Sequence, residues 1–153
     1  MKVDNSKEFA NFFTKIEDSR KVEFLVLHHT QAKSVDETIE MYLKHEVSTH
    51  FLITKRGKIY QLVAENNIAY HAGISYWNGV DGLNKCSIGI ELISENPYKK
   101  GHSKSQMKSC LKLVEELVNK YKITPQNVVS HSDIAYNKQT GFLNRKSDVC
   151  ELF

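Results

Sequence analysis

The amino-acid sequence predicts an α/β protein with a mixed central β-sheet of about five strands flanked by helices. Short β-rich apolar runs alternate along the chain with amphipathic stretches, a pattern that also suits an α+β sandwich. Two of the strand-like runs end in histidine, and a third carries one acidic residue among apolar ones. Because functional residues of such sheets gather at strand ends, we expect the site there.

Length and composition favour a compact protein without a membrane span. The 153 residues are about one domain length, so we expect a single domain over residues 1–153 and a monomer. Hydrophobic residues make up 41% of the chain, enough for one core. No apolar run approaches the roughly 18 residues of a membrane span. The net charge of +3 is spread along the chain, which does not favour a nucleic-acid partner.

The cellular location is predicted from the first residues and from the cysteines. Lys2, Asp4, Lys7 and Glu8 interrupt the apolar core that a secretory signal would need. The three cysteines are widely spaced, which fits neither a disulfide framework nor a zinc knuckle and favours a reducing compartment. We therefore expect a cytoplasmic protein, whereas a trimmed mature chain would be periplasmic or secreted.

The first third of the chain predicts a helix, a strand and a second helix. Apolar residues recur at three- and four-residue steps in Phe9–Ile16, which predicts a short amphipathic helix. Lys21–His28 is apolar and β-rich, as expected of a strand buried on both faces. Ser34–Glu37 has the pattern of a capping box, whose side chains satisfy free backbone N–H groups, so a second helix should begin there.

The middle of the chain predicts a hairpin followed by a long loop. Thr49–Thr54 and Lys58–Val63 are strand-like, and Gly57 between them can take the positive φ of a tight turn. Ala64–Lys85 contains glycines and aromatic residues without clear periodicity. Long loops of compact domains often bind ligands, which makes this segment a candidate for substrate contacts.

The remaining segments predict a strand, a long helix and a last short strand. Ser87–Ile93 is apolar apart from Glu91 and predicts a buried strand. Apolar residues up to Lys122 fall on one stripe of a helix that begins after Ser103. Asn127–His131 predicts a short strand that ends in histidine.

Two of these strand ends and the tail contain residues that suit a zinc site. His28 and His131 each close a predicted strand, and Asp148 follows in the tail. A catalytic zinc site has three convergent protein ligands and a fourth position for water. A sheet can bring distant strand ends together, so these three residues could converge. A histidine at a strand end is by itself more often structural, and the residues alone leave both interpretations open.

Glu91 and Lys146 are the other candidates for chemistry. A carboxylate within a buried strand costs several kcal/mol unless it is paired or faces a cavity. Glu91 is therefore either an outward-facing residue on a half-exposed strand or a general base near a metal-activated water. Lys146 is either a solvated surface residue or, beside a zinc ion, a charged donor to an oxyanion.

Several ordered motifs resemble the zinc-dependent N-acetylmuramoyl-L-alanine amidases, which include amidase-type phage lysozymes and peptidoglycan recognition proteins. The motifs span the chain from about Val22 to its end: FLVLHHT, STHFLITKRGKIYQLV, AYHAGISYWNG, NKCSIGIEL, NVVSHSDIA and RKSD. The sequence looks most similar to bacterial amidases that cleave muropeptides or their anhydro forms. The resemblance implies a peptidoglycan-amidase-like fold, a Zn²⁺ cofactor, and hydrolysis of the amide between N-acetylmuramic acid and L-alanine.

The resemblance also implies roles for individual residues. His28, His131 and Asp148 match the three zinc ligands of the family. Glu91 matches the catalytic acid and base, and Lys146 matches the lysine that stabilises the transition state. His29 should point the other way, because side chains alternate along a strand. In the long loop, His71, Tyr76 and Trp77 would line the substrate groove, although Trp77 suits the core equally well.

The sequence departs from the family pattern at three places. Tyr136–Asn144 adds residues between two motifs and lacks the usual prolines, which affects the placement of Lys146 and Asp148. Thr49 stands where phage lysozymes carry a catalytic tyrosine, so the base role falls to Glu91. Cys150 lies close to the third-ligand position and is the alternative to Asp148, because some relatives use cysteine there.

Two other functions compete with the amidase interpretation. Some recognition proteins of this fold bind peptidoglycan without cleaving it after losing a zinc ligand, but all three ligand types are present here. A cysteine hydrolase with Cys86 as nucleophile is the third possibility, although the segment lacks the glycines of a nucleophile elbow. For an amidase, the substrate is either intact cell wall or a soluble anhydromuropeptide.

Overall fold

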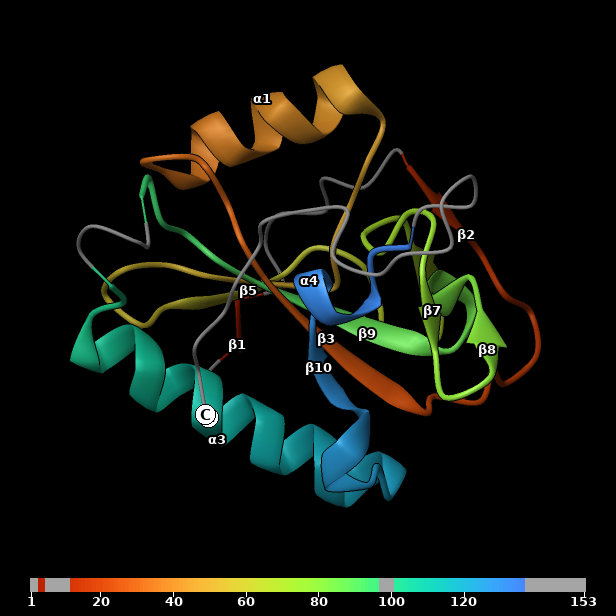
Figure 1. The fold of residues 1–153 in the computed structure, drawn as a ribbon. Helices are drawn as coiled ribbons and strands as arrows, with labels where there is room; N and C mark the ends of the chain where they lie inside the picture. The colour runs from red at the N-terminus through yellow and green to blue at the C-terminus, as the bar shows by residue number, and fades with distance from the viewer. Residues whose placement is uncertain (1–2, 5–11, 97–100, 137–153) are drawn as a thin grey trace.

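A six-stranded mixed sheet forms the centre of the computed structural model, which describes residues 3–4, 12–96 and 101–136 (Figure 1). In spatial order its strands are β1 (Val3–Asp4), β5 (Ile59–Gln61), β4 (Phe51–Ile53), β9 (Ser87–Leu92), β3 (Phe24–His29) and β10 (Val128–Ser130). Only β4 and β5 pair antiparallel, and the other neighbours are parallel. The predicted mixed sheet is confirmed, with the two-residue β1 as an additional edge strand.

The two central strands explain where the site can form. All residues of β3 are buried, and β9 is buried except at Glu91. Their parallel register pairs His28 with Glu91 near the carboxyl ends of both strands. On the other side of β3, Ser130 of β10 pairs with Leu27, so the next residue, His131, follows beside His28. The register alone therefore brings the three predicted residues to one edge of the sheet.

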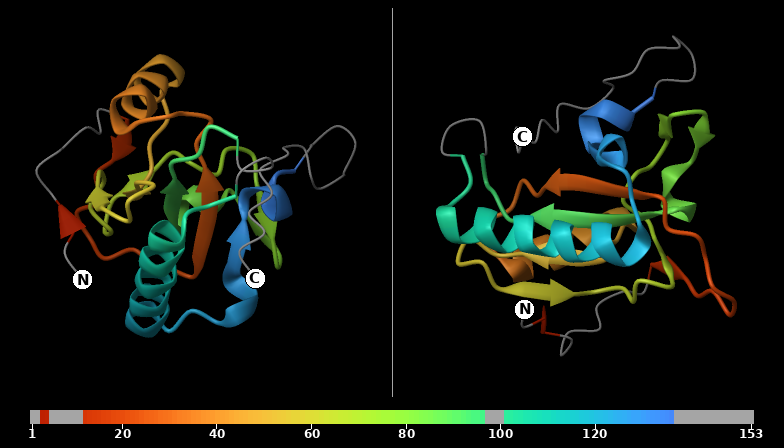
Figure 2. Two further views of the ribbon diagram at one scale, coloured as in Figure 1. Left: turned by 90° about the vertical axis from the view of Figure 1, so that its left-hand side faces the viewer. Right: turned by 90° about the horizontal axis from the view of Figure 1, so that it is seen from below.

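Helices cover both faces of the sheet (Figures 1 and 2). α3 (Lys104–Tyr121) packs Cys110, Leu113 and Leu117 against the main core on one face. On the other face, α1 (Val35–His45) packs Ile39 against Leu52 of β4. The second and third predicted helices are confirmed, and both begin at the predicted serine caps: Ser34 accepts from the Glu37 N–H and Ser103 from the Gln106 N–H.

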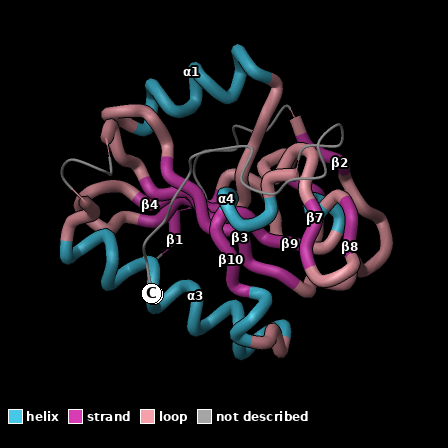
Figure 3. Tube along the Cα trace, viewed as in Figure 1, coloured by secondary structure: helices cyan, strands magenta, loops and turns pink. Residues whose placement is uncertain are grey.

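Short elements accompany the sheet and the long helices, and β6, β7, β8 and η1 among them lie within the predicted long loop Ala64–Lys85 (Figure 3). Two of them are strand pairs: β2 (Phe13–Thr14) with β6 (Ile68–Ala69), and β7 (Tyr76–Trp77) with β8 (Val80–Asp81). The others are the 3₁₀ turns η1 (Leu83–Lys85) and η2 (Pro125–Asn127) and the one-turn helix α4 (His131–Ile134).

The predicted hairpin is confirmed, and the first predicted helix is wrong in its described part. Gly57 closes the turn between β4 and β5 with a φ of +80°. Phe13–Thr14 is an extended strand instead of a helix, while residues 9–11 lie outside the described part of the chain. The physical reason is tertiary: Phe13 pairs with Ala69, and the Ser48 hydroxyl donates to the Phe12 carbonyl at 2.5 Å.

Among residues 12–96 and 101–136, none of the helices is both long and apolar enough to cross a bilayer.

His131, predicted as the last residue of a strand, instead begins α4, because Ser130 forms a capping box with Asp133. This turn carries the chain away from the sheet immediately after His131.

Candidate active site

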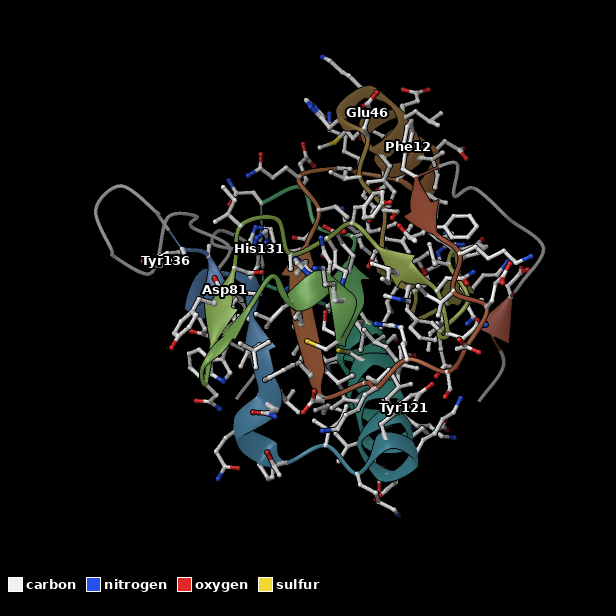
Figure 4. All side chains as sticks on the ribbon, turned by 90° about the vertical axis from the view of Figure 1, so that its right-hand side faces the viewer. Phe12, Glu46, Asp81, Tyr121, His131 and Tyr136 are labelled. Atoms are coloured by element: carbon white, nitrogen blue, oxygen red, sulfur yellow. The ribbon has the colours of Figure 1, made fainter. Side chains whose placement is uncertain are left out.

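A cavity of about 590 Å³ opens at the carboxyl ends of β3 and β9. His28, His71, Glu91 and His131 line it, together with Tyr42 of α1. Figure 4 shows His131 near the strand ends, while Tyr121 lies at the far end of α3. His29, which strand alternation turns away from its neighbour, also borders this cavity. The volume is typical of a small-molecule site.

His28 and His131 lie side by side and are both 3% exposed. Their Nδ1 atoms are 3.0 Å apart, and their rings meet at 72° with centroids separated by 4.7 Å. Two nitrogens bound to one tetrahedral zinc ion at about 2.05 Å would lie about 3.3 Å apart. The pair therefore suits a shared metal ion, because only a small adjustment separates the two geometries.

The remaining predicted site residues belong to the tail. Asp148, its alternative Cys150 and Lys146 are outside the described part of the chain. Within residues 3–4, 12–96 and 101–136, no three histidine, cysteine, aspartate or glutamate side chains form a metal-binding group. Of the three predicted ligands, the described part of the chain contains His28 and His131.

Glu91 is half-buried, and it borders the cavity. The Tyr42 hydroxyl on α1 donates a hydrogen bond to Oε2 of Glu91. Burial, followed by the neighbouring Glu91 charge, raises the pKa of Tyr42 well above its ordinary value, so this hydroxyl keeps its proton. The hydrogen bond therefore holds the carboxylate in place at the cavity that the histidine pair also lines.

Tyr42 is a site residue that the sequence interpretation missed. It falls on the helical stripe of α1, where an aromatic residue is typical of packing against the core. Its hydroxyl was the one available signal, because a buried tyrosine usually finds a hydrogen-bond partner. That signal does not name the partner, since Glu91 is 49 positions away in the sequence.

His71 borders the cavity next to His28. Its Nδ1 atom is 3.0 Å from Nε2 of His28. Burial lowers the pKa of His71 well below its ordinary value, so the ring is neutral at neutral pH. Whether His71 contacts a substrate stays a prediction.

Tyr76 and Trp77, the two aromatic residues predicted to line the substrate groove, lie away from the cavity that the described residues form. Tyr76 is 40% exposed, and neither Tyr76 nor Trp77 borders the cavity. The Trp77 indole donates to the Gln126 carbonyl at 3.0 Å and packs against the core cluster of Phe24 and Val129. This arrangement favours the core interpretation of Trp77.

His50 is a second residue that the sequence interpretation passed over. It is fully buried, and it accepts a hydrogen bond at Nδ1 from the Gly89 N–H at 3.0 Å. Its Nε2 therefore carries the proton and donates to the Asn67 carbonyl at 3.1 Å. Burial and then the charge of Arg20 lower the pKa of His50 to about 3. The neutral ring thus accepts from a backbone N–H of β9 at the position just before β4 begins.

Cys86 does not have the surroundings of a nucleophile. Its thiol is half-buried and donates weakly to the Leu83 carbonyl at 3.8 Å. Burial raises the pKa of Cys86, whereas a nucleophilic cysteine needs a lowered pKa to form the thiolate. Cys86 also does not border the cavity formed by the described residues.

Comparison with known proteins was made by sequence and by structure. The N-acetylmuramoyl-L-alanine amidase family model matches residues 18–148, a range that includes Lys146 and Asp148. AmiD of Escherichia coli is 35% identical over 129 residues, which cover 75% of this chain and 46% of AmiD. The 1,6-anhydro-N-acetylmuramyl-L-alanine amidase AmpD of Haemophilus influenzae is 38% identical over 90 residues, which cover 58% of this chain and 48% of AmpD. The chain thus spans about half the length of these curated relatives.

Solved structures of such proteins share the fold. E. coli AmiD in complex with the substrate anhydro-N-acetylmuramic acid-L-Ala-D-γ-Glu-L-Lys superposes with a TM-score of 0.68 at 28% identity, covering 82% of this chain and 58% of AmiD. AmpDH3 of Pseudomonas aeruginosa in complex with anhydromuramic pentapeptide superposes with a TM-score of 0.69 at 30% identity, covering 87% of this chain and 59% of AmpDH3. With the family model matching well over half of its residues, this chain belongs to the N-acetylmuramoyl-L-alanine amidase family.

Proposed function

We propose that this protein is a zinc-dependent amidase that hydrolyses the bond between N-acetylmuramic acid and the L-alanine of a muropeptide. The close approach of the His28 and His131 Nδ1 atoms, 3.0 Å apart beside the Glu91 carboxylate, carries the proposal. Membership of the amidase family supports it. A purely structural histidine pair would not require a carboxylate at the same edge of a cavity.

His28 and His131 would hold the zinc ion together with Asp148 from the tail. When bound in such a site, zinc supplies Lewis acidity that activates water and polarises an amide carbonyl. The family match that extends to residue 148 supports Asp148 as the third ligand. Comparing the zinc content of Asp148→Ala with that of Cys150→Ala tests this choice: Asp148→Ala should lose the metal, and a loss in Cys150→Ala alone would reverse the assignment.

Glu91 would move the proton during the reaction. Its carboxylate takes a proton from the attacking water and later delivers one to the leaving amine of L-alanine. The hydrogen bond from Tyr42 holds the carboxylate in position for both transfers. Lys146 would stabilise the negative charge that develops on the carbonyl oxygen, a contribution worth roughly 3–4 kcal/mol in comparable sites.

A soluble anhydromuropeptide is the substrate class that we propose. The AmiD and AmpDH3 complexes both contain an anhydromuramic peptide, and the cavity of about 590 Å³ suits a ligand of that size. The cytoplasmic location and the monomeric state expected from the sequence stay predictions.

The test compares two substrates for the zinc-loaded protein. The protein should release the free tripeptide from anhydromuramyl tripeptide faster than it releases peptides from insoluble sacculi. Mass spectrometry of the products measures both rates. Faster cleavage of sacculi would reject the anhydromuropeptide preference. Binding of both substrates without cleavage would reject the amidase and support the recognition-module alternative.

A further inference from the structure

The His71 imidazole lies between the ring of the predicted ligand His28 and the start of β9. Its Nδ1 atom lies 3.0 Å from Nε2 of His28, the nitrogen that does not face His131, and the two rings meet edge to face at 85°. The opposite nitrogen of His71, Nε2, lies 3.2 Å from the Ser87 hydroxyl at the start of β9. A row of polar groups therefore runs from His131 through His28 and His71 to Ser87.

Gly89 in the middle of β9 leaves the space that the His71 ring fills. A Cβ atom at position 89 would lie 2.6 Å from Cγ, 2.7 Å from Cδ2 and 2.8 Å from Nδ1 of His71. Gly89 is not among the glycines with positive φ, and its neighbours Ile88 and Ile90 are fully buried strand residues. The absence of a side chain, rather than backbone freedom, is therefore what this position provides.

The main chain of His71 is held separately from its ring. The Asn84 side-chain oxygen accepts hydrogen bonds from the backbone N–H groups of His71 and Ala72, at 3.1 and 2.7 Å. Asn84 lies in η1, shortly before β9. A single segment that runs from Asn84 to Gly89 thus positions both the backbone and the ring of His71.

We propose that His71 is a positioning residue that fixes the tautomer and the orientation of the metal ligand His28; this inference rests on the proposed zinc site. A neutral imidazole donates from only one of its nitrogens. If Nδ1 of His28 presents its lone pair to an ion shared with His131, its Nε2 carries the proton and donates to Nδ1 of His71. Nε2 of His71 then donates to the Ser87 hydroxyl.

The reverse order of protons would not allow the same metal site. If His71 donated from Nδ1, Nε2 of His28 would accept, and the proton of His28 would sit on Nδ1, where the ion has to bind. Partners on the free nitrogen of a ligating histidine typically change metal affinity 10–100-fold when they are removed. Both nitrogens of His71 bond within the protein in this role, so polar contacts to the substrate fall to other residues.

The test uses Zn²⁺ alone and two variants at position 71. His71→Leu removes the acceptor, and its zinc dissociation constant, measured by competition with a chromophoric chelator, should rise about 10–100-fold. His71→Asn places an amide oxygen near the position of Nδ1 and should restore affinity close to that of the parent. An unchanged dissociation constant in a folded His71→Leu variant overturns the inference.

Side-chain nitrogen NMR provides a readout that a merely structural role would not move. In the zinc-loaded parent, His28 should carry its proton on Nε2 and coordinate through Nδ1, and His71→Asn should keep this pattern. Coordination of His28 through Nε2 overturns the inference. Because these spectra need only the parent and the Asn variant, they decide the question even if His71→Leu does not fold.

Gly89→Ala tests the space that the ring fills. The added methyl group should displace His71 and weaken zinc binding in the parent, but it should have little further effect in the His71→Ala background, where the space is vacant. If Gly89→Ala weakens zinc binding equally in both backgrounds, Gly89 does not act by leaving space for the His71 ring.

His131→Ala separates failure of this inference from failure of the proposed zinc site. If the parent binds one zinc ion and His131→Ala does not, a parent-like His71→Leu rejects only the role of His71. If the parent binds no zinc, or His131→Ala binds it as tightly as the parent, the zinc site is wrong and this inference fails with it.

Discussion

Glu91 is surrounded in sequence by the apolar residues of a buried strand, yet its carboxylate borders the cavity and has a hydroxyl partner. A carboxylate without such a partner would cost several kcal/mol in a buried strand. The Tyr42 hydroxyl reduces this cost and also fixes the carboxylate relative to His28, its neighbour in the β3–β9 register. Position and hydrogen bonding together support the proposed role of Glu91 in proton transfer.

Glu91→Gln removes the proton acceptor and keeps the size of the side chain. The turnover number should fall by about 10²–10⁴-fold, because general base catalysis is lost, while zinc content stays at the parent level. Turnover of anhydromuramyl tripeptide and metal analysis of the purified variant check this. Glu95→Gln, an exposed position nearby, is the control and should keep parent activity. Parent-like turnover in Glu91→Gln would show that the base is another group.

Tyr42→Phe removes only the hydroxyl that donates to Glu91. A hydrogen bond to a charged group is worth about 1.5–3 kcal/mol, so the turnover number should fall by about tenfold or more. The Michaelis constant should change little, because Tyr42 acts through the carboxylate. Steady-state kinetics separate the two parameters, and Tyr76→Phe on the exposed β7 serves as the control. A raised Michaelis constant with unchanged turnover would instead indicate a substrate contact by Tyr42.

His50 makes the stability of the metal-free protein depend on pH. Burial and the charge of Arg20 lower its pKa from 6.5 to about 3, so the unfolded chain binds the proton first as the pH falls. The stability that this residue contributes is complete above about pH 6.5 and is lost as the pH falls toward about 3, at up to about 1.4 kcal/mol per pH unit.

The measurement compares urea unfolding of the metal-free parent and of His50→Gln between pH 7 and pH 5. The parent should lose stability more steeply with falling pH, by roughly 1 kcal/mol per unit, although the variant is less stable overall. Identical slopes for the parent and His50→Gln would contradict a buried neutral His50.

At the scale of elements, the turn of the β4–β5 hairpin packs closely against α3. A Cβ atom at Gly57 would lie 2.6 Å from the Ser105 backbone carbonyl of α3, and Gly57 has a φ of +80°. Gly79 has a similar φ of +83° with no atom within 4 Å of its Cβ position. The two glycines thus share the conformational requirement but differ in the contact.

Gly57→Ala should therefore lower the free energy of unfolding more than Gly79→Ala does. The positive φ costs roughly 1–2 kcal/mol in both variants, and the clash with α3 adds to this cost only at position 57. Chemical denaturation of both proteins measures the difference directly. Equal losses would show that the turn moves away from α3 without cost.

Most elements could be predicted from the sequence because their signals are local. Ser34 and Ser103 cap the two helices as their patterns indicate, and Gly57 closes the predicted turn. Phe13–Thr14 is an exception, since the aromatic spacing suits a helix while pairing with β6 requires an extended chain. A contact between segments that distant in sequence overrides the local preference.

At the scale of the whole molecule, zinc binding should stabilise the folded state. A ligand that binds only the folded state stabilises it by RT ln(1 + [L]/Kd), about 2.7 kcal/mol at a free concentration of 100 times Kd. The melting temperature should therefore rise with added Zn²⁺ and fall with a chelator. His131→Ala should remove this dependence, as calorimetry or fluorescence melting would show. A metal-independent melting temperature in the parent would contradict the site.

The sequence by itself determined the kinds of groups at the site, because imidazoles at the ends of two apolar strands and one carboxylate within a third can be read from the order of residues. Only the tertiary structure decided which of these groups meet: the parallel register of β10, β3 and β9 brings the two Nδ1 atoms to 3.0 Å and sets Glu91 beside them. It also decided that Tyr42 bonds to Glu91, that His71 lies against His28, and that Gly89 leaves room for the His71 ring. Contacts between segments so distant in sequence leave no local pattern. Hydrophobic periodicity reports which face of an element is buried, whereas the identity of the neighbour depends on how the sheet and its helices pack.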